Sequence, residues 1–379
     1  MSDDITPFRI EIPEAELDDL RLRLRRTRWP ERETVDGWSQ GMPLSYARDL
    51  CQYWLDQYDW RASEARLNRF AQFRTEIDGL DIHFIHVRSP REDALPLLIT
   101  HGWPGSIVEF HKIIEPLSDP QSHGGDPSDA FHVVCPSLPG YAFSGKPGQP
   151  GWSTARTADA WDQLMTRLGY ARYGAQGGDW GAQVTTGLGI RHPEHLAGIH
   201  LNMPIAFPGP DQQDDMTDRE KAALATIKHY NDWDSGYFKE QATRPQTVGY
   251  GLVDSPAGLC AWIIEKFWSW TDSDGDPASV LSRDEMLDNV MLYWLPATGA
   301  SSARMYWESV KTALFDPVGI PVGCSIFPKE IFRPSRRWAE RQFTDIRYWN
   351  EPDKGGHFAA FEQPELFVEE VRAAFRAFR

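Results

Sequence analysis

The run Gly177-Gly178-Asp179-Trp180-Gly181 constrains this chain more than any other feature of its sequence. It lies between a short apolar segment, 173–176, and a helix-like segment, 181–191. Small residues around one carboxylate predict a tight and strained turn, because larger side chains would collide there. Parallel sheets are built from strands that lead into helices in this way. The run therefore predicts that Asp179 stands at the edge of a parallel sheet, at the start of a helix.

Strand-like and helix-like segments alternate on both sides of this turn. The expected strands are a hairpin at 73–89 that turns at Asp78-Gly79, and segments 95–100, 131–139, 173–176, 196–203, 318–328 and 344–349. The expected helices are 13–27, 43–70, 106–117, 154–168, 181–191 and 364–378. This alternation predicts an α/β fold with a mostly parallel central sheet and helices on both faces.

Residues 204–312 interrupt the alternation, because they are largely helical and rich in aromatic side chains. We therefore expect three parts in the chain. They are an N-terminal helical segment at 1–72, an α/β core at 73–203 and 313–379, and a helical lid at 204–312.

The turn around Asp179 has the pattern of a nucleophile elbow, with Asp where lipases and esterases have Ser. A carboxylate with a pKa near 3.9 is ionised at neutral pH, so it can attack a saturated carbon and form an alkyl ester. Epoxides and alkyl halides are the two main substrates for such an attack. The pattern alone is weak evidence, because Asp is also a common helix N-cap.

A second turn, 101–106 with the sequence HGWPGS, directly follows a buried strand. In this arrangement one oxyanion-hole amide comes from this turn and the other from the residue after the nucleophile. The expected donors are the backbone amides of Trp103 and Trp180. A Gly/Pro-rich turn without chemistry is the alternative.

The candidate base is His357, which lies on the Gly-rich loop 355–358 near the C-terminus. Its position after the nucleophile and the acid is the chain order that this kind of fold requires. The preferred acid is Glu330, at the end of the penultimate predicted strand, and Asp345 and Asp353 are its competitors. A carboxylate there would orient the imidazole that deprotonates water.

Opening an epoxide generates an alkoxide, so a hydrogen-bond donor has to face the nucleophile. A tyrosine hydroxyl suits this task because it is neutral at pH 7 but more acidic than an alcohol. The sequence by itself does not choose among the lid tyrosines, which are Tyr230, Tyr237, Tyr250, Tyr293 and Tyr306.

Composition excludes several other classes of protein. The net charge of −16 disfavours nucleic acid as a partner. The four cysteines, Cys51, Cys135, Cys260 and Cys324, form no CxxC pair, so we expect no disulfide framework, metal site or cofactor. The start, MSDDITPFRI, lacks an apolar signal region, and no run of 18 apolar residues occurs. These features predict a cytoplasmic protein without a membrane anchor.

With these residues in place, the chain resembles the microsomal and juvenile-hormone epoxide hydrolase family over nearly its full length. The resemblance rests on a set of blocks: RIEIPEAELDDLRLRLRRTRWP, HGWPGSIVEFHKII, PSLPGYAFSG, QGGDWG, TRPQTVGYGLVDSP, EKFWSW, NVMLYW, FPKE and GGHFAAFEQPE. It implies Asp179 as nucleophile, His357 as base and Glu330 as acid. It also implies Tyr237 and Tyr306 as the ring-opening tyrosines, and the Trp103 and Trp180 amides as the oxyanion hole.

Three functional hypotheses remain at this stage. The first is hydrolysis of a bulky hydrophobic epoxide to a vicinal diol, with water as co-substrate and no cofactor. The resemblance extends it to natural-product pathways such as enediyne biosynthesis. The second is a haloalkane dehalogenase on the same core, and the third is a lid-gated binder of apolar ligands without activity. A homodimer is plausible in each case.

Overall fold

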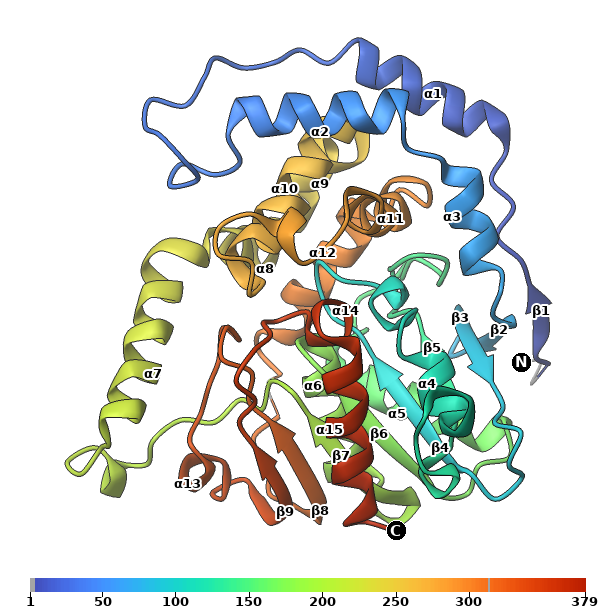
Figure 1. Cartoon of the computed structure of the whole chain (residues 1–379), viewed down its shortest axis with the longest axis vertical. Coiled ribbons are helices and arrows are strands. Elements are labelled where there is room, and N and C mark those ends of the chain that lie inside the picture. Colours follow the sequence, from blue (N-terminus) through green and yellow to red (C-terminus); the bar gives the residue numbers. More distant parts are fainter. Residues whose placement is uncertain (1–3, 313) are drawn as a thin grey trace.

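The computed structural model describes residues 4–312 and 314–379. Within these residues, nine strands form one sheet in the order β1-β2-β3-β5-β4-β6-β7-β8-β9 (Figure 1). The strands are β1 (Thr6–Phe8), β2 (Gln72–Ile77), β3 (Leu80–Val87), β4 (Leu95–Thr100), β5 (Phe131–Pro136), β6 (Tyr173–Gly177), β7 (Leu196–Leu201), β8 (Val318–Ser325) and β9 (Phe343–Asn350).

The sheet is antiparallel at one edge and parallel from β5 to β9. Strands β1, β2, β3 and β5 pair antiparallel, and each later neighbouring pair is parallel. The predicted hairpin is confirmed, because β2 and β3 are joined at Asp78 and Gly79, which have φ values of 52° and 76°. Positive φ at both residues is the geometry of a type I′ turn, which Asp-Gly favours.

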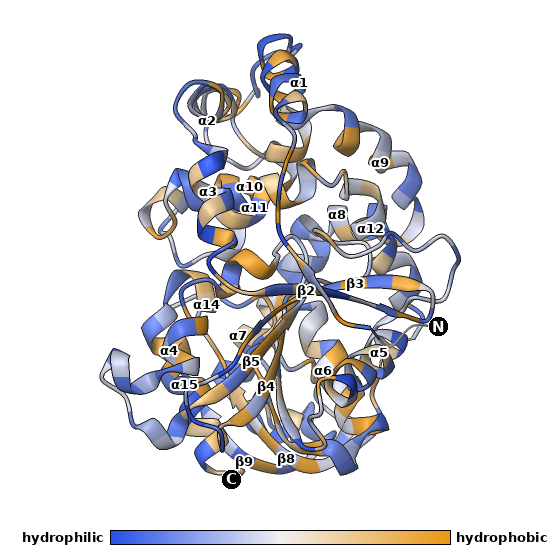
Figure 2. Cartoon of the chain, turned by 90° about the vertical axis from the view of Figure 1, so that its right-hand side faces the viewer, coloured by the Kyte–Doolittle hydropathy of each residue, from blue (hydrophilic) through white to orange (hydrophobic). Residues whose placement is uncertain are grey.

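Helices cover both faces of this sheet, as the alternation of segments predicted (Figure 2). Helices α5 (Thr154–Arg167) and α6 (Trp180–Arg191) pack together on one face. Helices α4 (Ile114–Ser118) and α15 (Pro364–Arg376) cover the other face, where the short helix α14 (Ala359–Glu362) packs against α15. The short helix α13 (Arg336–Ala339) lies between β8 and β9 in the chain. Central strands are buried on both faces, so β4 and β5 are continuous apolar runs without alternation.

Two predicted helices are each divided in two in the structure. Segment 43–70 forms α2 (Leu44–Asp56) and α3 (Trp60–Leu67), because the Asp59 side chain accepts hydrogen bonds from the Arg61 and Ala62 amides and starts a new helix. Segment 106–117 forms a 3₁₀ turn, Ile107–Phe110, and then α4. Pro116 lies in the first turn of α4, where its missing N–H group does no harm. Strand β1 was not predicted.

Among the described residues, six α-helices lie between β7 and β8, away from the sheet (Figure 1). They are α7 (Asp218–His229), α8 (Gly236–Thr243), α9 (Pro245–Asp254), α10 (Pro256–Trp270), α11 (Arg283–Trp294) and α12 (Gly299–Ser309), and a π-helical turn, Tyr230–Asp234, joins α7 to α8. Among the described residues, no helix combines the length and the apolar character that a membrane span needs.

The N-terminal helices α1 (Glu14–Arg25), α2 and α3 lie across this helical insert (Figure 1). Tyr53 donates a hydrogen bond to Asp284 at 2.8 Å, and Tyr58 donates one to Asp288 at 2.7 Å. Arg66 of α3 forms an ion pair with the same buried Asp288 at 2.9 Å. Polar contacts between chain segments more than 200 residues apart therefore fasten the N-terminal helices to α11.

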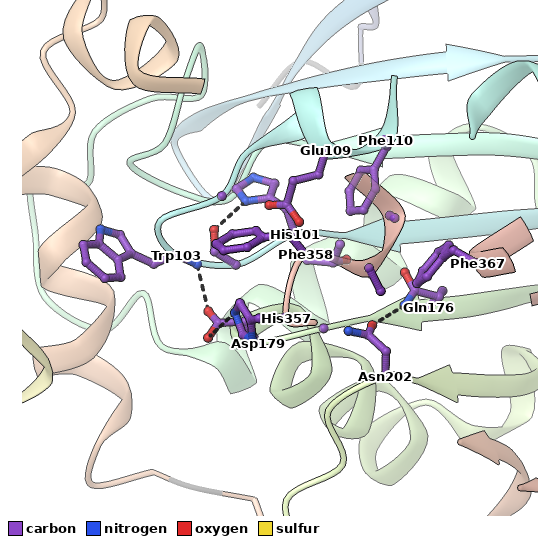
Figure 3. Close-up of a pocket in the computed structure, with 16 residues that line it drawn as sticks. His101, Trp103, Glu109, Phe110, Gln176, Asp179, Asn202, His357, Phe358 and Phe367 are labelled. Carbon is purple, nitrogen blue, oxygen red and sulfur yellow. Dashed lines mark hydrogen bonds and ion pairs between the residues drawn. The ribbon is translucent and has the colours of Figure 1, made fainter. Parts of the chain in front are cut away.

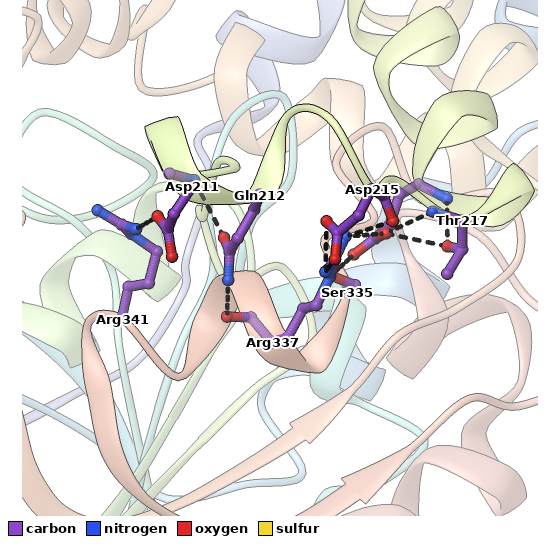
Figure 4. A network of polar contacts seen from close by, with 9 residues as sticks. Asp211, Gln212, Asp215, Thr217, Ser335, Arg337 and Arg341 are labelled. Carbon is purple, nitrogen blue, oxygen red and sulfur yellow. Dashed lines mark hydrogen bonds and ion pairs between the residues drawn. The ribbon is translucent and has the colours of Figure 1, made fainter.

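A second group of polar contacts holds the beginning of the insert on the core (Figure 4). Arg337 of α13 contacts Glu220 at 2.6 Å and Asp215 at 3.0 Å, and Arg341 contacts Asp211 at 2.9 Å. The Arg337 guanidinium is the main reason why the pKa of Glu220 is lowered to about 2. The connection between β7 and α7 is therefore held on the core by charge-assisted hydrogen bonds.

Candidate active site

The turn that carries Asp179 is strained and closely packed. Asp179 has φ 51° and ψ −128°, a region of the Ramachandran map that residues other than glycine rarely enter. A Cβ atom on Gly181 would lie 2.0 Å from the Thr100 carbonyl oxygen, and one on Gly177 would lie 2.1 Å from the Gly181 carbonyl oxygen. Only glycine fits at these two positions, which explains the small residues around the carboxylate.

Backbone amides hold the Asp179 carboxylate in place. The Trp103 amide donates a hydrogen bond to Oδ1 at 2.8 Å (Figure 3). Burial raises the pKa of Asp179, whereas the charge of His357 and the amides of Trp103 and Trp180 act in the opposite direction. A Cβ atom on Gly102 would lie 2.1 Å from Asp179 Oδ1. Residue 102 therefore has to be glycine for the backbone of this turn to approach the carboxylate so closely.

The structure brings His357 between two carboxylates. Its Nδ1 lies 2.7 Å from Glu330 Oε1, and its Nε2 lies 3.6 Å from Asp179 Oδ2. Burial lowers the pKa of His357, but Glu330, Asp179 and Glu109 outweigh this effect and raise it to about 9. His357 is therefore protonated at neutral pH as long as Asp179 carries its negative charge.

The two competing acids lie away from this histidine. Asp345 is paired with Arg347 at 2.8 Å at the edge of the sheet, and Asp353 is exposed. Glu330 is almost completely buried, at 1% exposure, and its other oxygen, Oε2, has no hydrogen-bond partner among the described residues. A buried carboxylate of this kind is stabilised as an anion by its charged neighbour.

The five candidate tyrosines of the helical insert occupy different environments. Tyr237 and Tyr306 are buried, and their ring centres lie 5.8 Å apart, each against the Trp103 ring. Tyr230 shares a hydrogen bond of 2.7 Å with the Tyr237 hydroxyl. Tyr250 is 71% exposed, and Tyr293 donates a hydrogen bond to the Gly105 carbonyl at 2.6 Å. The structure therefore gathers three of the five predicted tyrosines at one place.

Tyr306 is the most unusual of these three. Its hydroxyl is buried and makes no hydrogen bond of good geometry among residues 4–312 and 314–379, although the Tyr306 side chain is close enough to Tyr237 to lower the pKa of that phenol. An unsatisfied buried hydroxyl destabilises a protein by about 1–3 kcal/mol, so it usually marks a place where a ligand or water binds.

Two cavities meet at Asp179, which is the one described residue that lines both of them. The larger cavity has a volume of about 200 Å³. Its walls combine the three tyrosines with apolar side chains, namely Met203, Ile205, Phe238, Phe315, Ile331 and Phe332. The smaller cavity leaves about 20 Å³ in which the centre of a water molecule can lie. It is lined by His357, Glu109 and Gln176, among others (Figure 3). That volume suits one ordered water.

Glu109 is a residue of this site that the motifs did not single out. It forms a capping box with Ser106, whose amide donates to Glu109 Oε1 at 3.0 Å. Burial is the main reason why the pKa of Glu109 is raised, to about 8. The sequence does carry a signal, because Ser-x-x-Glu directly after the HGWPG turn predicts a helix start at the sheet edge.

The sheet order, the strained turn and the His357–Glu330 pair on neighbouring loops define a protein of the α/β-hydrolase fold, with a carboxylate in the elbow position. Family models support this: residues 5–110 match "Epoxide hydrolase N terminus", and residues 96–252 match "alpha/beta hydrolase fold". The chain belongs to the epoxide hydrolase family that has this N-terminal segment.

Relatives cover the chain almost completely. It is 58% identical to a protein of Stigmatella aurantiaca named "Putative epoxide hydrolase", over 99% of this chain and 86% of the relative. Epoxide hydrolase 1 of Sus scrofa is 36% identical over 97% of this chain and 88% of its own length.

Solved structures agree with the sequence relatives. Juvenile hormone epoxide hydrolase of Bombyx mori superposes with a TM-score of 0.90 at 30% identity, over 99% of this chain and 95% of that one. The Aspergillus niger epoxide hydrolase superposes with a TM-score of 0.89 at 34% identity, over 99% and 97%. The expected fold and family are therefore confirmed.

Proposed function

We propose that this protein hydrolyses epoxides to vicinal diols through an ester on Asp179, with His357 and Glu330 activating the water. The observation that carries this proposal is the position of Asp179 between two cavities. Three tyrosines, Tyr230, Tyr237 and Tyr306, line the large cavity beside the carboxylate, and His357 lines the small cavity that shares Asp179 with it. The two steps of the reaction then take place in two cavities that meet at one side chain.

In the first step, an Asp179 oxygen attacks a ring carbon of the epoxide and the C–O bond on the far side breaks. Tyr237 and Tyr306 donate hydrogen bonds to the departing oxygen, and Tyr237 gives it a proton. Tyr230 can donate to Tyr237 at the same time, since their hydroxyls lie 2.7 Å apart, and a chain of hydrogen bonds strengthens each member. The unpaired Tyr306 hydroxyl supports this role.

In the second step, His357 deprotonates a water that attacks the ester carbonyl carbon. Ester formation removes the negative charge that lies 3.6 Å from the imidazole, so the pKa of His357 falls and the ring becomes a neutral base. The amides of Trp103 and Trp180 hold the oxyanion, and the diol leaves as Asp179 regains its charge. Tyr237 regains its proton as His357 loses one after the first step, and the released alkoxide takes the proton of the Asp179 carboxyl group when the tetrahedral intermediate collapses.

The proposed substrate is a bulky hydrophobic epoxide. The cavity of about 200 Å³ and its mostly apolar walls support this choice. The helical insert between β7 and β8 acts as a lid in this proposal, because it supplies all three tyrosines. The resemblance to hydrolases of natural-product pathways extends the proposal to an epoxide intermediate of such a pathway.

The test uses His357→Gln with styrene oxide and intact-protein mass spectrometry. The variant should accumulate an adduct with the mass of the epoxide on Asp179, and the wild type should not. In ¹⁸O water, a single turnover of the wild type should give diol without label, because one oxygen comes from the epoxide and the other from Asp179, and the ¹⁸O should appear in the Asp179 carboxylate. Absence of the adduct, together with full turnover by the variant, would contradict the proposal.

A haloalkane dehalogenase is the second candidate on the same core. It needs donors that bind a halide, and the pair of buried tyrosines favours an epoxide oxygen instead. Release of chloride from 1-chlorobutane at a rate similar to that of epoxide turnover would favour this alternative.

A further inference from the structure

A buried lysine lies against Tyr237 and has no part in the reaction described so far. Lys266 of α10 is only 5% exposed, and its ammonium lies over the Tyr237 ring, 4.8 Å from the ring centre. Trp270, four residues later on the same side of the helix, is also covered by this ammonium, at 5.5 Å. A lysine this deeply buried is rare unless its charge is paired or used.

The ion-pair partner of Lys266 is Glu265, its neighbour in the chain. The Glu265 side chain is 22% exposed and that of Lys266 is 6% exposed. Water therefore screens the charge of the carboxylate more than that of the ammonium. The electrostatic effect of the ammonium is then strongest on the two aromatic rings that it covers. Trp103 stacks on Tyr237 at 4.8 Å with an interplanar angle of 10°, which leaves the opposite ring face for the ammonium.

We infer that Lys266 is a positioning residue that makes the Tyr237 hydroxyl a stronger proton donor to the epoxide oxygen. This inference rests on the proposed function, since it assigns a cause to the strength of one donor in the first step. Lys266 touches neither substrate nor water in this assignment. It acts through the Tyr237 ring.

The physical reason is the charge that develops when the epoxide opens. Burial raises the pKa of Tyr237 well above its usual value, which weakens it as a donor. A cation over the ring face stabilises negative charge on the ring and its oxygen, so it opposes this effect. The ammonium is in place before the reaction begins, and preorganised charges of this kind act in the transition state without reorganisation. An uncharged side chain of similar shape would pack equally well without this effect.

The experiment measures the rate of ester formation in single turnovers with styrene oxide. Lys266→Met keeps the unbranched shape and removes the charge, and we expect ester formation to slow about tenfold. Hydrolysis of the ester should keep its wild-type rate. Lys266→Arg retains a cation and should restore most of the loss. The matched control is Lys228→Met on α7, which removes an exposed lysine that pairs with Asp232, and its rates should equal those of the wild type.

A double-mutant cycle separates this role from a purely structural one. In a Tyr237→Phe background, Lys266→Met should cause almost no further loss, because the hydroxyl on which it acts is gone. In a Tyr306→Phe background, the tenfold loss should persist. The inference would be overturned if Lys266→Met slowed ester formation equally in the wild type, in Tyr237→Phe and in Tyr306→Phe. It would also be overturned if Lys266→Met alone left the rate of ester formation unchanged.

Folding and the proposed function are checked independently. Circular dichroism should give the same spectrum for each variant as for the wild type, and Lys266→Gln replaces Lys266→Met if the latter does not fold. If His357→Gln forms no adduct with styrene oxide, the ester mechanism itself is wrong. If the adduct forms and only the cycle fails, the role of Lys266 is wrong and the ester mechanism stands.

Discussion

His357 and Asp179 face each other across 3.6 Å, between imidazole Nε2 and carboxylate Oδ2, while Nδ1 of the same ring lies 2.7 Å from Glu330. One ring is therefore an ion-pair partner of the proposed nucleophile and a hydrogen-bond partner of the proposed acid. This arrangement makes the charge of His357 depend on the charge of Asp179, and it has consequences that can be measured in stability and in rates.

The stability of the wild type relative to His357→Gln should depend on pH. The folded-state pKa of His357 is about 9 and its unfolded value is near 6.5. A raised pKa means that the protonated ring stabilises the fold fully below pH 6.5, and that this contribution is lost as pH rises through 9. Urea unfolding of both proteins from pH 6 to pH 10 checks this. A difference in free energy that does not change with pH contradicts it.

Glu330→Gln should slow the second step and leave the first nearly unchanged. The amide has the same shape as the carboxylate but no charge, so it neither raises the pKa of His357 nor stabilises the imidazolium. We expect ester hydrolysis to slow by a factor of about 10³ to 10⁴. The adduct should then accumulate in mass spectra, as it should in His357→Gln. Asp345→Asn is the control, because that side chain pairs with Arg347 at the sheet edge.

Tyr306→Phe should make the protein more stable and less active. The Tyr306 hydroxyl is buried without a partner among the described residues, so its removal should raise the free energy of unfolding by about 1 kcal/mol. Ester formation should slow about a hundredfold, because one donor to the departing oxygen is lost. Thermal unfolding and single-turnover kinetics measure the two effects. A variant that is both less stable and fully active would show that the hydroxyl is structural.

Gly181→Ala should disrupt the elbow, whereas the same change at Gly251 should not. The new Cβ at position 181 would lie 2.0 Å from the Thr100 carbonyl oxygen, so strand β4 or helix α6 has to move. We expect a loss of about 3 kcal/mol or more in the free energy of unfolding, together with loss of activity. Gly251 lies in α9, where an added Cβ meets no atom beyond the backbone of its own helix and its chain neighbours within 4 Å, and alanine there should stabilise the helix by about 0.5–1 kcal/mol. Similar stability of the two variants would contradict this reading.

The sequence predicted the parts of the fold that depend on local patterns. Strands buried on both faces are unbroken apolar runs, and the Asp78-Gly79 turn and the elbow glycines have backbone geometries that few residues allow. The predictions failed where a helix had to be divided. The Asp59 side chain starts a new helix at α3, and Pro116 lies in the first turn of α4; apolar periodicity does not reveal where these helices begin.

The sequence by itself determined the chemical groups, because a carboxylate in an elbow and a histidine on a late glycine-rich loop occur in a chain order that only one kind of fold brings together. Only the tertiary structure decided that Tyr230 joins Tyr237 and Tyr306 at the cavity beside Asp179, that a second cavity shares this residue, and that Lys266 covers the ring of Tyr237. The physical reason is that these relations join helices of the insert to loops of the sheet. Contacts between segments so far apart are set by packing, and no local pattern of residues encodes them.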